Sequence, residues 1–253
     1  MKLTATKTMI LAALAFSSAA FAQTKAPEPD YTLAYNVGVV TDYRFRGISQ
    51  TRLKPALQGG IDFTHSSGFY LGFWGSTIKV IEDTYAGADG PVELDFYGGY
   101  RGKFSDTVSY DLGLLRYQYP KQNLPAGAAT FNTTELYGAV TFGPATVKYS
   151  HSIGDETFGV ANSRGSYYLE AAATFDLGMY GLTLTPHIGR QHFSKGNNIA
   201  SYTDISLALG KDFGNGFSGS LALYGTNADE TFYTIGGKYL GKNGVVAGVK
   251  YAF

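Results

Sequence analysis

The stretch that decides the predicted fold is Val245–Phe253, which reads Val-Val-Ala-Gly-Val-Lys-Tyr-Ala-Phe. Successive side chains of an extended strand point to opposite sides. One face therefore collects every second residue: Val245, Ala247, Val249, Tyr251 and Phe253. The other face is mostly small and carries the charged Lys250. An apolar alternation that ends on an aromatic residue is typical of the closing strand of a transmembrane β-barrel, although a soluble β-sandwich can also end this way.

The first residues have the three parts of a secretory signal peptide. Lys2 and Lys7 are basic, an apolar run follows, and Ala20-Phe21-Ala22 is a small-x-small cleavage site. We therefore expect residues 1–22 to be removed by cleavage between Ala22 and Gln23. No later stretch approaches the ~18 uninterrupted apolar residues that a membrane-spanning helix needs.

The composition excludes several classes of protein. Without the signal peptide, 18 basic and 20 acidic residues remain, and this near balance argues against a nucleic-acid partner. Cysteine is absent, so disulfides and thiolate metal sites are excluded. The 20 Tyr and 17 Phe are numerous enough to form the aromatic girdles that membrane barrels carry at both interfaces.

The rest of the chain repeats the pattern of the last strand. Residues 23–30 are a polar lead that we expect to be disordered on the periplasmic side, and 31–253 are predicted to form the barrel. The first strand is predicted from Tyr31 to about Phe45. Long connections at 47–57, 79–91, 118–132, 153–165 and 191–201 alternate with short ones at 65–68, 103–106, 143–144, 177–181 and 212–216. Short periplasmic turns and longer extracellular loops are the rhythm of outer-membrane barrels.

Counting these segments predicts an all-β, antiparallel, up-and-down barrel of about twelve strands, with fourteen as the alternative. Residues 232–240 also look extended, but bacterial single-chain barrels have an even number of strands. We therefore interpret Asn227–Asn243 as an external loop with some extended structure. Pro186 lies within a good strand and lacks an N–H, so we predict a bulge or an interrupted ladder there.

Several stretches resemble a known family. They include Thr41–Thr51 (TDYRFRGISQT), 55–62 (PALQGGID) and 72–76 (GFWGS), and the likeness continues through 117–120 and 165–170. These residues resemble the TorF family of proteobacterial outer-membrane proteins, whose name presumes a porin. The resemblance covers nearly the whole mature chain and implies a barrel with a pore, without specifying a solute.

The polar face of the predicted strands supplies the candidate pore-lining residues. By alternation they are Asp42, Arg44, Arg46, Asp62, Trp74, Glu93, Asp95, Arg101, Asp111, Glu135, Tyr137, Lys148, Glu170, His187, Asp204 and Lys250. Ionisable groups opposite a lipid face are costly unless they line water or pair with each other. Twelve strands lie between filled barrels of about eight and open ones of about sixteen, so a narrow pore and a plugged, structural or ligand-specific barrel both remain open. We favour the narrow pore.

Acidic residues outnumber basic ones on this face, which predicts a weak cation preference. Arg44 and Arg46 are expected near the outer mouth, where they would attract anions, unless they pair with Asp62, Glu93 or Asp95 on neighbouring strands.

An enzymatic alternative rests on His192 and Ser194. Outer-membrane phospholipase is a barrel of similar size whose His and Ser lie two residues apart on a lipid-facing strand, and His192-Phe193-Ser194 has that spacing. A hydroxyl nucleophile needs its base within hydrogen-bond reach and a third group that orients the base, and none is evident here. We therefore predict a protein that is not an enzyme.

The expected partners follow from this interpretation. They are outer-membrane lipid, small polar solutes and the barrel-assembly machinery, which would read Tyr251 and Phe253 as an assembly signal. His187 and His192 differ in parity, so a shared metal is not expected, and no phosphate-binding or calcium-loop motif predicts a cofactor.

Overall fold

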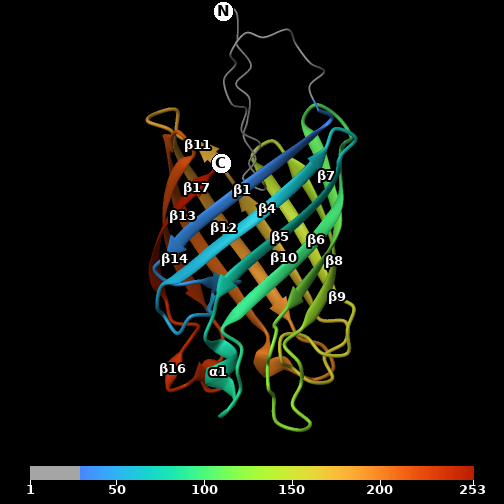
Figure 1. Ribbon diagram of the computed structural model, residues 1–253, viewed down its shortest axis with the longest axis vertical. Helices are drawn as coiled ribbons and strands as arrows, with labels where there is room; N and C mark the ends of the chain where they lie inside the picture. The colour runs from blue at the N-terminus through green and yellow to red at the C-terminus, as the bar shows by residue number, and fades with distance from the viewer. Residues whose placement is uncertain (1–28) are drawn as a thin grey trace, which may run out of the picture.

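The computed structural model of the chain describes residues 29–253, which form a closed β-barrel (Figure 1). The predicted signal peptide, its cleavage site at Ala22 and Gln23, and residues 23–28 of the predicted disordered lead lie outside the described residues. Asp30, the last residue of that lead, accepts a hydrogen bond from the backbone N–H of Ser66 at 2.7 Å. The end of the lead is therefore attached to the rim of the barrel.

The strands of the wall follow one another in chain order. They are β1 (Tyr31–Val40), β4 (Ala56–His65), β5 (Phe69–Thr77), β6 (Val92–Lys103), β7 (Val108–Gln118), β8 (Thr133–Phe142), β9 (Ala145–Ser152), β10 (Tyr167–Ala173), β11 (Phe175–Asp176), β12 (Leu182–His192), β13 (Tyr202–Gly214), β14 (Phe217–Thr226) and β17 (Gly244–Ala252).

Antiparallel pairing closes this wall on itself. The last strand, β17, pairs with β1, so that Asn36 lies opposite Ala252 and Val40 opposite Gly248. Both β10 and β11 pair with β12 in the same register and are two parts of one strand. The wall therefore has twelve strands and no free edge, which confirms the predicted number and topology.

The prediction at Pro186 is also confirmed. The β10–β12 ladder stops at the pair Ala172–His187 and resumes in β11 at Phe175–Leu184, without a shift in register. The gap lies where Pro186 provides no N–H to its neighbour. On the other side, Pro186 stays in register with Leu207 of β13.

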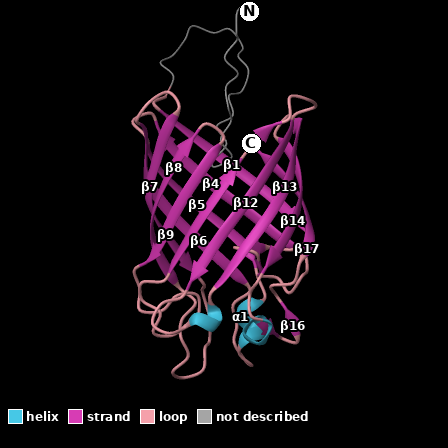
Figure 2. Ribbon diagram, turned by 180° about the vertical axis from the view of Figure 1, so that it is seen from behind, coloured by secondary structure: helices cyan, strands magenta, loops and turns pink. Residues whose placement is uncertain are grey.

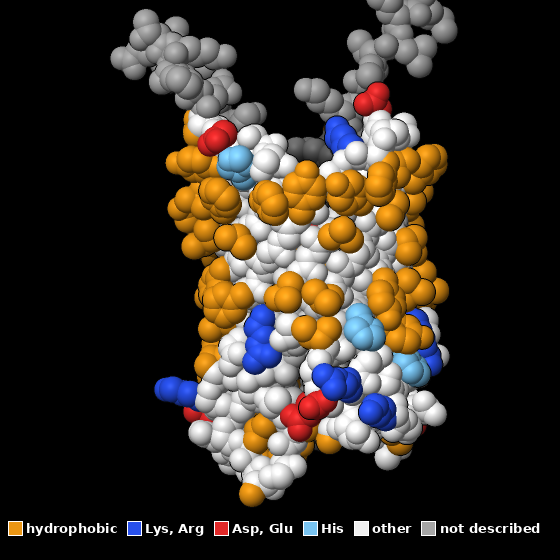
Figure 3. All heavy atoms as spheres, turned by 90° about the vertical axis from the view of Figure 1, so that its right-hand side faces the viewer, with side chains coloured by type: hydrophobic (Ala, Val, Ile, Leu, Met, Phe, Trp, Pro, Cys, Tyr) orange, Lys and Arg blue, Asp and Glu red, His pale blue; other side chains and the backbone are white. Residues whose placement is uncertain are grey.

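The outward face of the barrel is apolar, as the alternation predicts. Leu71, Leu112 and Val249 are 65%, 56% and 53% exposed, and Figure 3 shows hydrophobic side chains over the wall. An exposed apolar band on this scale requires hydrocarbon around it. No helix in residues 29–253 is long and apolar enough to cross a membrane.

Long and short connections lie at opposite ends of the barrel. All the helical segments belong to the long-loop end: α1 (Val80–Thr84), the 3-10 turn η1 (Asn198–Ala200) and α2 (Glu230–Tyr233), as Figure 2 shows for the helices. The C-terminus and the beginning of β1 lie at the short-turn end (Figure 1). Residues 227–243 form a loop that contains the small hairpin β15 (Thr234–Ile235) and β16 (Lys238–Tyr239), as predicted.

The prediction of a first strand reaching Phe45 was wrong. Strand β1 ends at Val40, and the chain then forms a short hairpin from β2 (Arg44–Phe45) and β3 (Ile48–Ser49). Arg46 and Gly47 form its tip with positive φ values of 48° and 81°. A side-chain carbon on Gly47 would lie 2.7 Å from Asp204 and from Thr226, so the tip is pressed against the inner wall.

The main hydrophobic core fills the long-loop end of the barrel. Ile81 of α1 and Leu240 of the 227–243 loop are completely buried in it. Further members come from the hairpin and from the strand ends: Ile48, Ile78, Val80, Tyr117, Tyr119, Phe131, Tyr202, Ala228 and Tyr233. The loops at this end therefore pack together as a folded plug over the outer half of the lumen.

Candidate functional site

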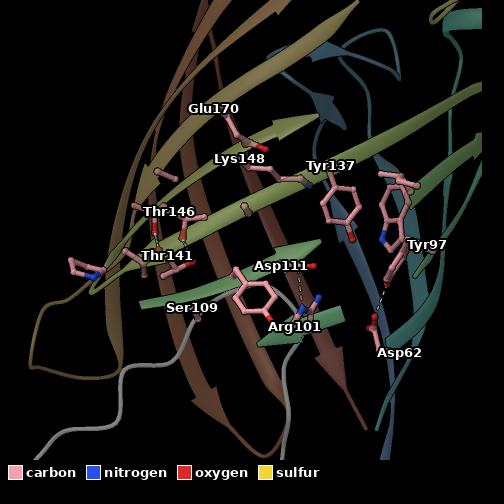
Figure 4. A pocket seen from close by; sticks show the side chains of 18 of the residues that line it. Asp62, Tyr97, Arg101, Ser109, Asp111, Tyr137, Thr141, Thr146, Lys148 and Glu170 are labelled. Carbon is pink, nitrogen blue, oxygen red and sulfur yellow. Dashed lines mark hydrogen bonds and ion pairs between the residues drawn. The ribbon is translucent and has the colours of Figure 1, made fainter. Parts of the chain in front are cut away.

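A cavity of about 1030 Å³, called the inner cavity below, lies inside the barrel towards the short-turn end (Figure 4). Its lining brings together eight of the predicted residues: Asp62, Trp74, Arg101, Asp111, Tyr137, Lys148, Glu170 and Lys250. Tyr97, which the sequence analysis did not single out, lies among them. With Lys103 at its rim, the cavity is lined by four basic and three acidic side chains. The acidic excess predicted for the whole polar face is therefore absent from this cavity.

The acidic residues of the inner cavity are held by neighbouring donors. Arg101 Nε donates to Asp111 Oδ2 at 3.0 Å, and the Tyr70 hydroxyl donates to Asp111 Oδ1 at 2.5 Å. The Tyr97 hydroxyl donates to Asp62 Oδ1 at 2.6 Å (Figure 4). These contacts fix the acidic side chains against the wall and keep the centre of the cavity clear of them.

The three lysines of the inner cavity, Lys103 at its rim and Lys148 and Lys250 on its wall, have no ion-pair partner among residues 29–253. Lys148 Nζ lies 4.4 Å from the centre of the Tyr137 ring, a cation–π contact that leaves its N–H groups available. Lys250 of β17 is also half-buried on the cavity wall. The cavity therefore presents free positive charge and paired negative charge.

A second, smaller cavity of about 310 Å³, the middle cavity, adjoins the first and shares Lys148 and Glu170 with it. His187 bridges two acids there: its Nε2 lies 3.1 Å from Glu170 and its Nδ1 lies 3.6 Å from Asp204. The Tyr168 hydroxyl also donates to Asp204, at 2.9 Å. The hairpin tip covers this cavity on the side of the long loops.

Arg46 fixes the hairpin tip to the barrel wall. Its guanidinium donates to both carboxylate oxygens of Glu135 at 2.9 and 2.6 Å and to Gln191 Oε1 at 2.6 Å. It also lies 4.3 Å from the centre of the Tyr168 ring. Burial alone would lower the pKa of Arg46, but attraction to Glu135 outweighs it, so the pKa is raised and the charge is permanent.

Arg44 holds the hairpin through contacts to Asp42 and to the 227–243 loop. Its Nε donates to Asp42 Oδ2 at 2.5 Å, and its Nη1 donates to the carbonyls of Leu240 and Lys242 at 3.2 and 2.9 Å. The expected partners of Arg44 and Arg46, namely Asp62, Glu93 and Asp95, are in neither ion pair. Both arginines do form structural ion pairs, but the end of β1 at Val40 gives them other partners.

Glu93 and Asp95 of β6 are packed beneath the loop core. The Tyr43 hydroxyl donates to Glu93 Oε1 at 3.1 Å, and burial together with these two acids raises the pKa of Tyr43. Glu93 Oε2 and Asp95 Oδ1 are buried without a hydrogen-bond partner among the described residues. Neither acid lines the inner or the middle cavity, and the same holds for Asp42 and Glu135.

The sequence analysis did not single out several residues that form hydrogen bonds inside the lumen. Tyr70, Tyr168 and Gln191 lie on the inward-facing positions of β5, β10 and β12 and contact Asp111, Asp204 and Arg46. The signal was present in the sequence, because each shares its parity with a predicted polar residue of its strand.

The structure does not assemble the hydrolase pair. Ser194 Oγ donates to the Gly165 carbonyl at 2.8 Å, and the His192 ring lies on Tyr167 at 4.9 Å between ring centres. No hydrogen bond joins Ser194 to His192 in the described part of the chain. Residues 29–253 also contain no group of three His, Cys, Asp or Glu side chains placed to hold a metal ion.

Comparison with known proteins identifies the fold. The structure of the KdgM porin in complex with disordered oligogalacturonate has a TM-score of 0.54 at 9% identity and covers 87% of this chain and 98% of KdgM. A structure from a study of in-meso crystallisation of membrane proteins has a TM-score of 0.52 at 6% identity and covers 87% of this chain and 83% of its own. OprD from Pseudomonas aeruginosa has a TM-score of 0.41 at 18% identity, over 87% of this chain and 65% of OprD.

At these identities the likeness concerns the barrel fold alone. No curated protein matches the chain in sequence. The name TorF is not confirmed by these comparisons. A family model described as a bacterial protein of unknown function (Gcw_chp) does match residues 24–253, nearly the whole chain, and the chain belongs to that family.

Proposed function

We propose that this protein is an outer-membrane channel, of the TorF porin type, through which small polar solutes diffuse passively. The observation that carries the proposal is the inner cavity, a polar, charged space of about 1030 Å³ inside a closed transmembrane barrel. A barrel that served only as a scaffold would gain nothing from keeping lysines free in its interior. No catalytic group is required, and we propose that the protein is not an enzyme.

The proposed mechanism combines exclusion by width with selection by charge. The inner cavity admits solutes from the short-turn end, which faces the periplasm in outer-membrane barrels. Lys148 and Lys250 attract anionic or dipolar groups there. The acids offer less attraction to cations, because Asp62 accepts a hydrogen bond from Tyr97. Asp111 likewise accepts from Arg101 and from Tyr70. The hairpin tip at Arg46 and the loop core form the barrier, so conduction depends on movement of this tip.

A plugged barrel is the second candidate, because the loop core closes the outer half of the lumen. Ile81, Leu240 and Ser49 are fully buried there, as in the interior of a soluble domain. In that case the lumen would hold a specific ligand or only support the structure, and solutes would not cross.

Single-channel recording in planar bilayers separates the two candidates. The purified full chain is expected to give discrete steps of small conductance that report on a narrow path. A preparation that is folded, as shown by heat-dependent migration in gels, yet gives no steps over a wide voltage range would refute the diffusion channel and favour the plugged barrel.

Export and assembly complete the proposal. Cleavage after Ala22 would leave Gln23 as the first residue, and Tyr251 and Phe253 of the last strand would be recognised by the barrel-assembly machinery. The two rings stack at 5.6 Å, and Phe253 also stacks on Tyr35 of β1 at 5.7 Å, so the same residues seal the seam of the barrel. N-terminal sequencing of the membrane-extracted protein tests the cleavage site.

A further inference from the structure

The charged side chains on the outward face of the wall strands have one sign. No outward-facing position of the described wall strands holds Asp or Glu, whereas the outward-facing ionisable residues at the long-loop end are Arg116, His151, Arg190 and His192. Figure 3 shows Lys, Arg and His side chains below the hydrophobic band at that end, with acidic side chains beside them in the loops. A lipid-facing charge is costly unless it meets a counter-charge at the membrane surface.

Four strands bring these residues together at one height. His151 of β9 is paired in register with Tyr167 of β10, which is paired with His192 of β12. The rings form a continuous row, with 4.9 Å between the centres of Tyr167 and His192 and 5.5 Å between Tyr167 and Tyr149. Arg190 lies one outward position below His192 on the same strand, and Arg116 of β7 lies two strands beyond β9.

The arginines of this row are free of acids. Arg190 is exposed and reaches only the Thr203 hydroxyl, at 3.3 Å. Arg116 donates to Gln118 and, at 2.9 Å, to the Thr134 hydroxyl. Neither forms an ion pair with any residue of 29–253. Two cations with only neutral partners at a membrane boundary lack their counter-ion.

The acids of the loop between β9 and β10 contact other groups. Asp155 lies 3.5 Å from Arg164, and Glu156 accepts the backbone N–H of Thr130 at 2.6 Å. Neither acid forms an ion pair with Arg116 or Arg190. The missing negative charge has to come from outside the protein.

We propose that this outer-wall patch, made of Arg116, His151, Tyr167, Arg190 and His192, binds the phosphate groups of a phosphorylated glycolipid in the outer leaflet. The aromatic row marks the depth at which hydrocarbon gives way to headgroups, and the arginines at that depth can each hold a phosphate with paired N–H groups. Two arginines separated by four strand spacings, roughly 20 Å of wall, suit a wide headgroup or two neighbouring molecules. The inference rests on the proposed outer-membrane location and not on conduction.

Lipid binding to the purified full chain in detergent tests the proposal. The probe is lipid A that carries both phosphates, compared with lipid A from which they have been removed, and bound lipid is counted by native mass spectrometry. We expect the phosphorylated form to bind at least about tenfold more tightly, and the double variant R116Q/R190Q to lose this preference. The matched control is K211Q, because Lys211 also lies on the outward-facing side, at the short-turn end, where it donates to the Tyr180 carbonyl.

Each outcome decides the question. Equal binding of both forms of lipid A, or a preference that survives R116Q/R190Q, would overturn the patch. Competition by inorganic phosphate at the same concentration would show a site for a free anion rather than a lipid headgroup, and would also overturn it. A channel that conducts but ignores phosphorylated lipid A refutes only this inference, whereas a barrel that binds the lipid and does not conduct refutes only the proposed function.

Discussion

Arg46 and Glu135 form a two-pronged ion pair, 2.9 and 2.6 Å long, between the tip of the β2–β3 hairpin and the wall strand β8. Both side chains are nearly inaccessible, at 7% and 1% exposure. Only three residues separate the end of β1 from the hairpin, and the hairpin itself is short. The ion pair therefore holds the hairpin in place inside the lumen. The position of Arg46 therefore sets the width of the path above the middle cavity.

Replacing Arg46 with Ala is expected to increase single-channel conductance and to reduce stability. The guanidinium occupies the lumen, and its loss frees both the space and the hairpin tip. Removal of one partner also leaves Glu135 as an unpaired buried charge, which costs about 3 kcal/mol in comparable buried pairs. Planar-bilayer recording and thermal unfolding in detergent measure the two effects.

The double variant R46A/E135Q provides the control for this prediction. The double variant has no unpaired buried charge at this position. It should therefore be more stable than the sum of the two single changes implies, with a coupling free energy of about 1–3 kcal/mol. Conductance that stays at the wild-type level in R46A would mean that the hairpin is not the barrier.

The wall of the barrel was predictable because its signal is local and repeated. A lipid-facing residue at every second position, as in Val245–Phe253, can be recognised without knowledge of the rest of the fold. The same rule assigned an inward direction to Asp62, Arg101, Asp111, Lys148, Glu170 and Lys250, which line the inner cavity. The same rule failed after Val40. The apparent alternation continues through Tyr43 and Phe45, but these rings pack into the loop core and not against lipid.

The interior of the outer half could not be predicted for a related reason. Pairing of Arg46 with Glu135 and Gln191 brings together three segments that are distant in the chain, and alternation along a strand says nothing about such contacts. Only the sharp turn of the hairpin has a signal in the sequence, because its position with positive φ is occupied by a glycine, Gly47.

Neutralising Lys148 and Lys250 together is expected to shift ion selectivity toward cations. They are unpaired positive charges on the wall of the inner cavity, so K148Q/K250Q should lower the chloride-to-potassium permeability ratio by about twofold or more. Reversal potentials in a salt gradient measure this ratio. K211Q is the matched control, since Lys211 lies outside the lumen. An unchanged ratio would place both lysines away from the path of the ions.

Replacing Asp95 and Asp111 with Asn should change the thermal stability of the protein in opposite directions. Asp95 is buried, with one oxygen unpartnered among the described residues and Glu93 two positions away on the same face. Asn at this position removes an acid that is buried beside another acid, and we expect a gain of about 1 kcal/mol, or about 2–4 °C in a domain of this size. D111N instead removes the negative charge that pairs with Arg101 and should lower the melting temperature. Thermal unfolding of both variants in one detergent compares them directly, and a loss of stability in D95N would show that its carboxylate has an essential partner.

Leu240 is the residue on which the packing of the long loops depends most directly. It is completely buried, its N–H donates to the Tyr233 carbonyl at 3.0 Å, and its carbonyl accepts from Arg44 and from the backbone of Ser49. L240A should therefore leave a cavity between the 227–243 loop and the hairpin, at a cost of about 2–5 kcal/mol.

Leu221 on the lipid face of β14 is the matched control, because the membrane or detergent fills the space that L221A vacates. Limited proteolysis should cut the 227–243 loop of L240A faster than that of L221A while the barrel itself stays resistant. Equal cleavage of the two variants would mean that the loops hold together without this core, and the plug over the lumen would have to be explained by the ion pairs alone.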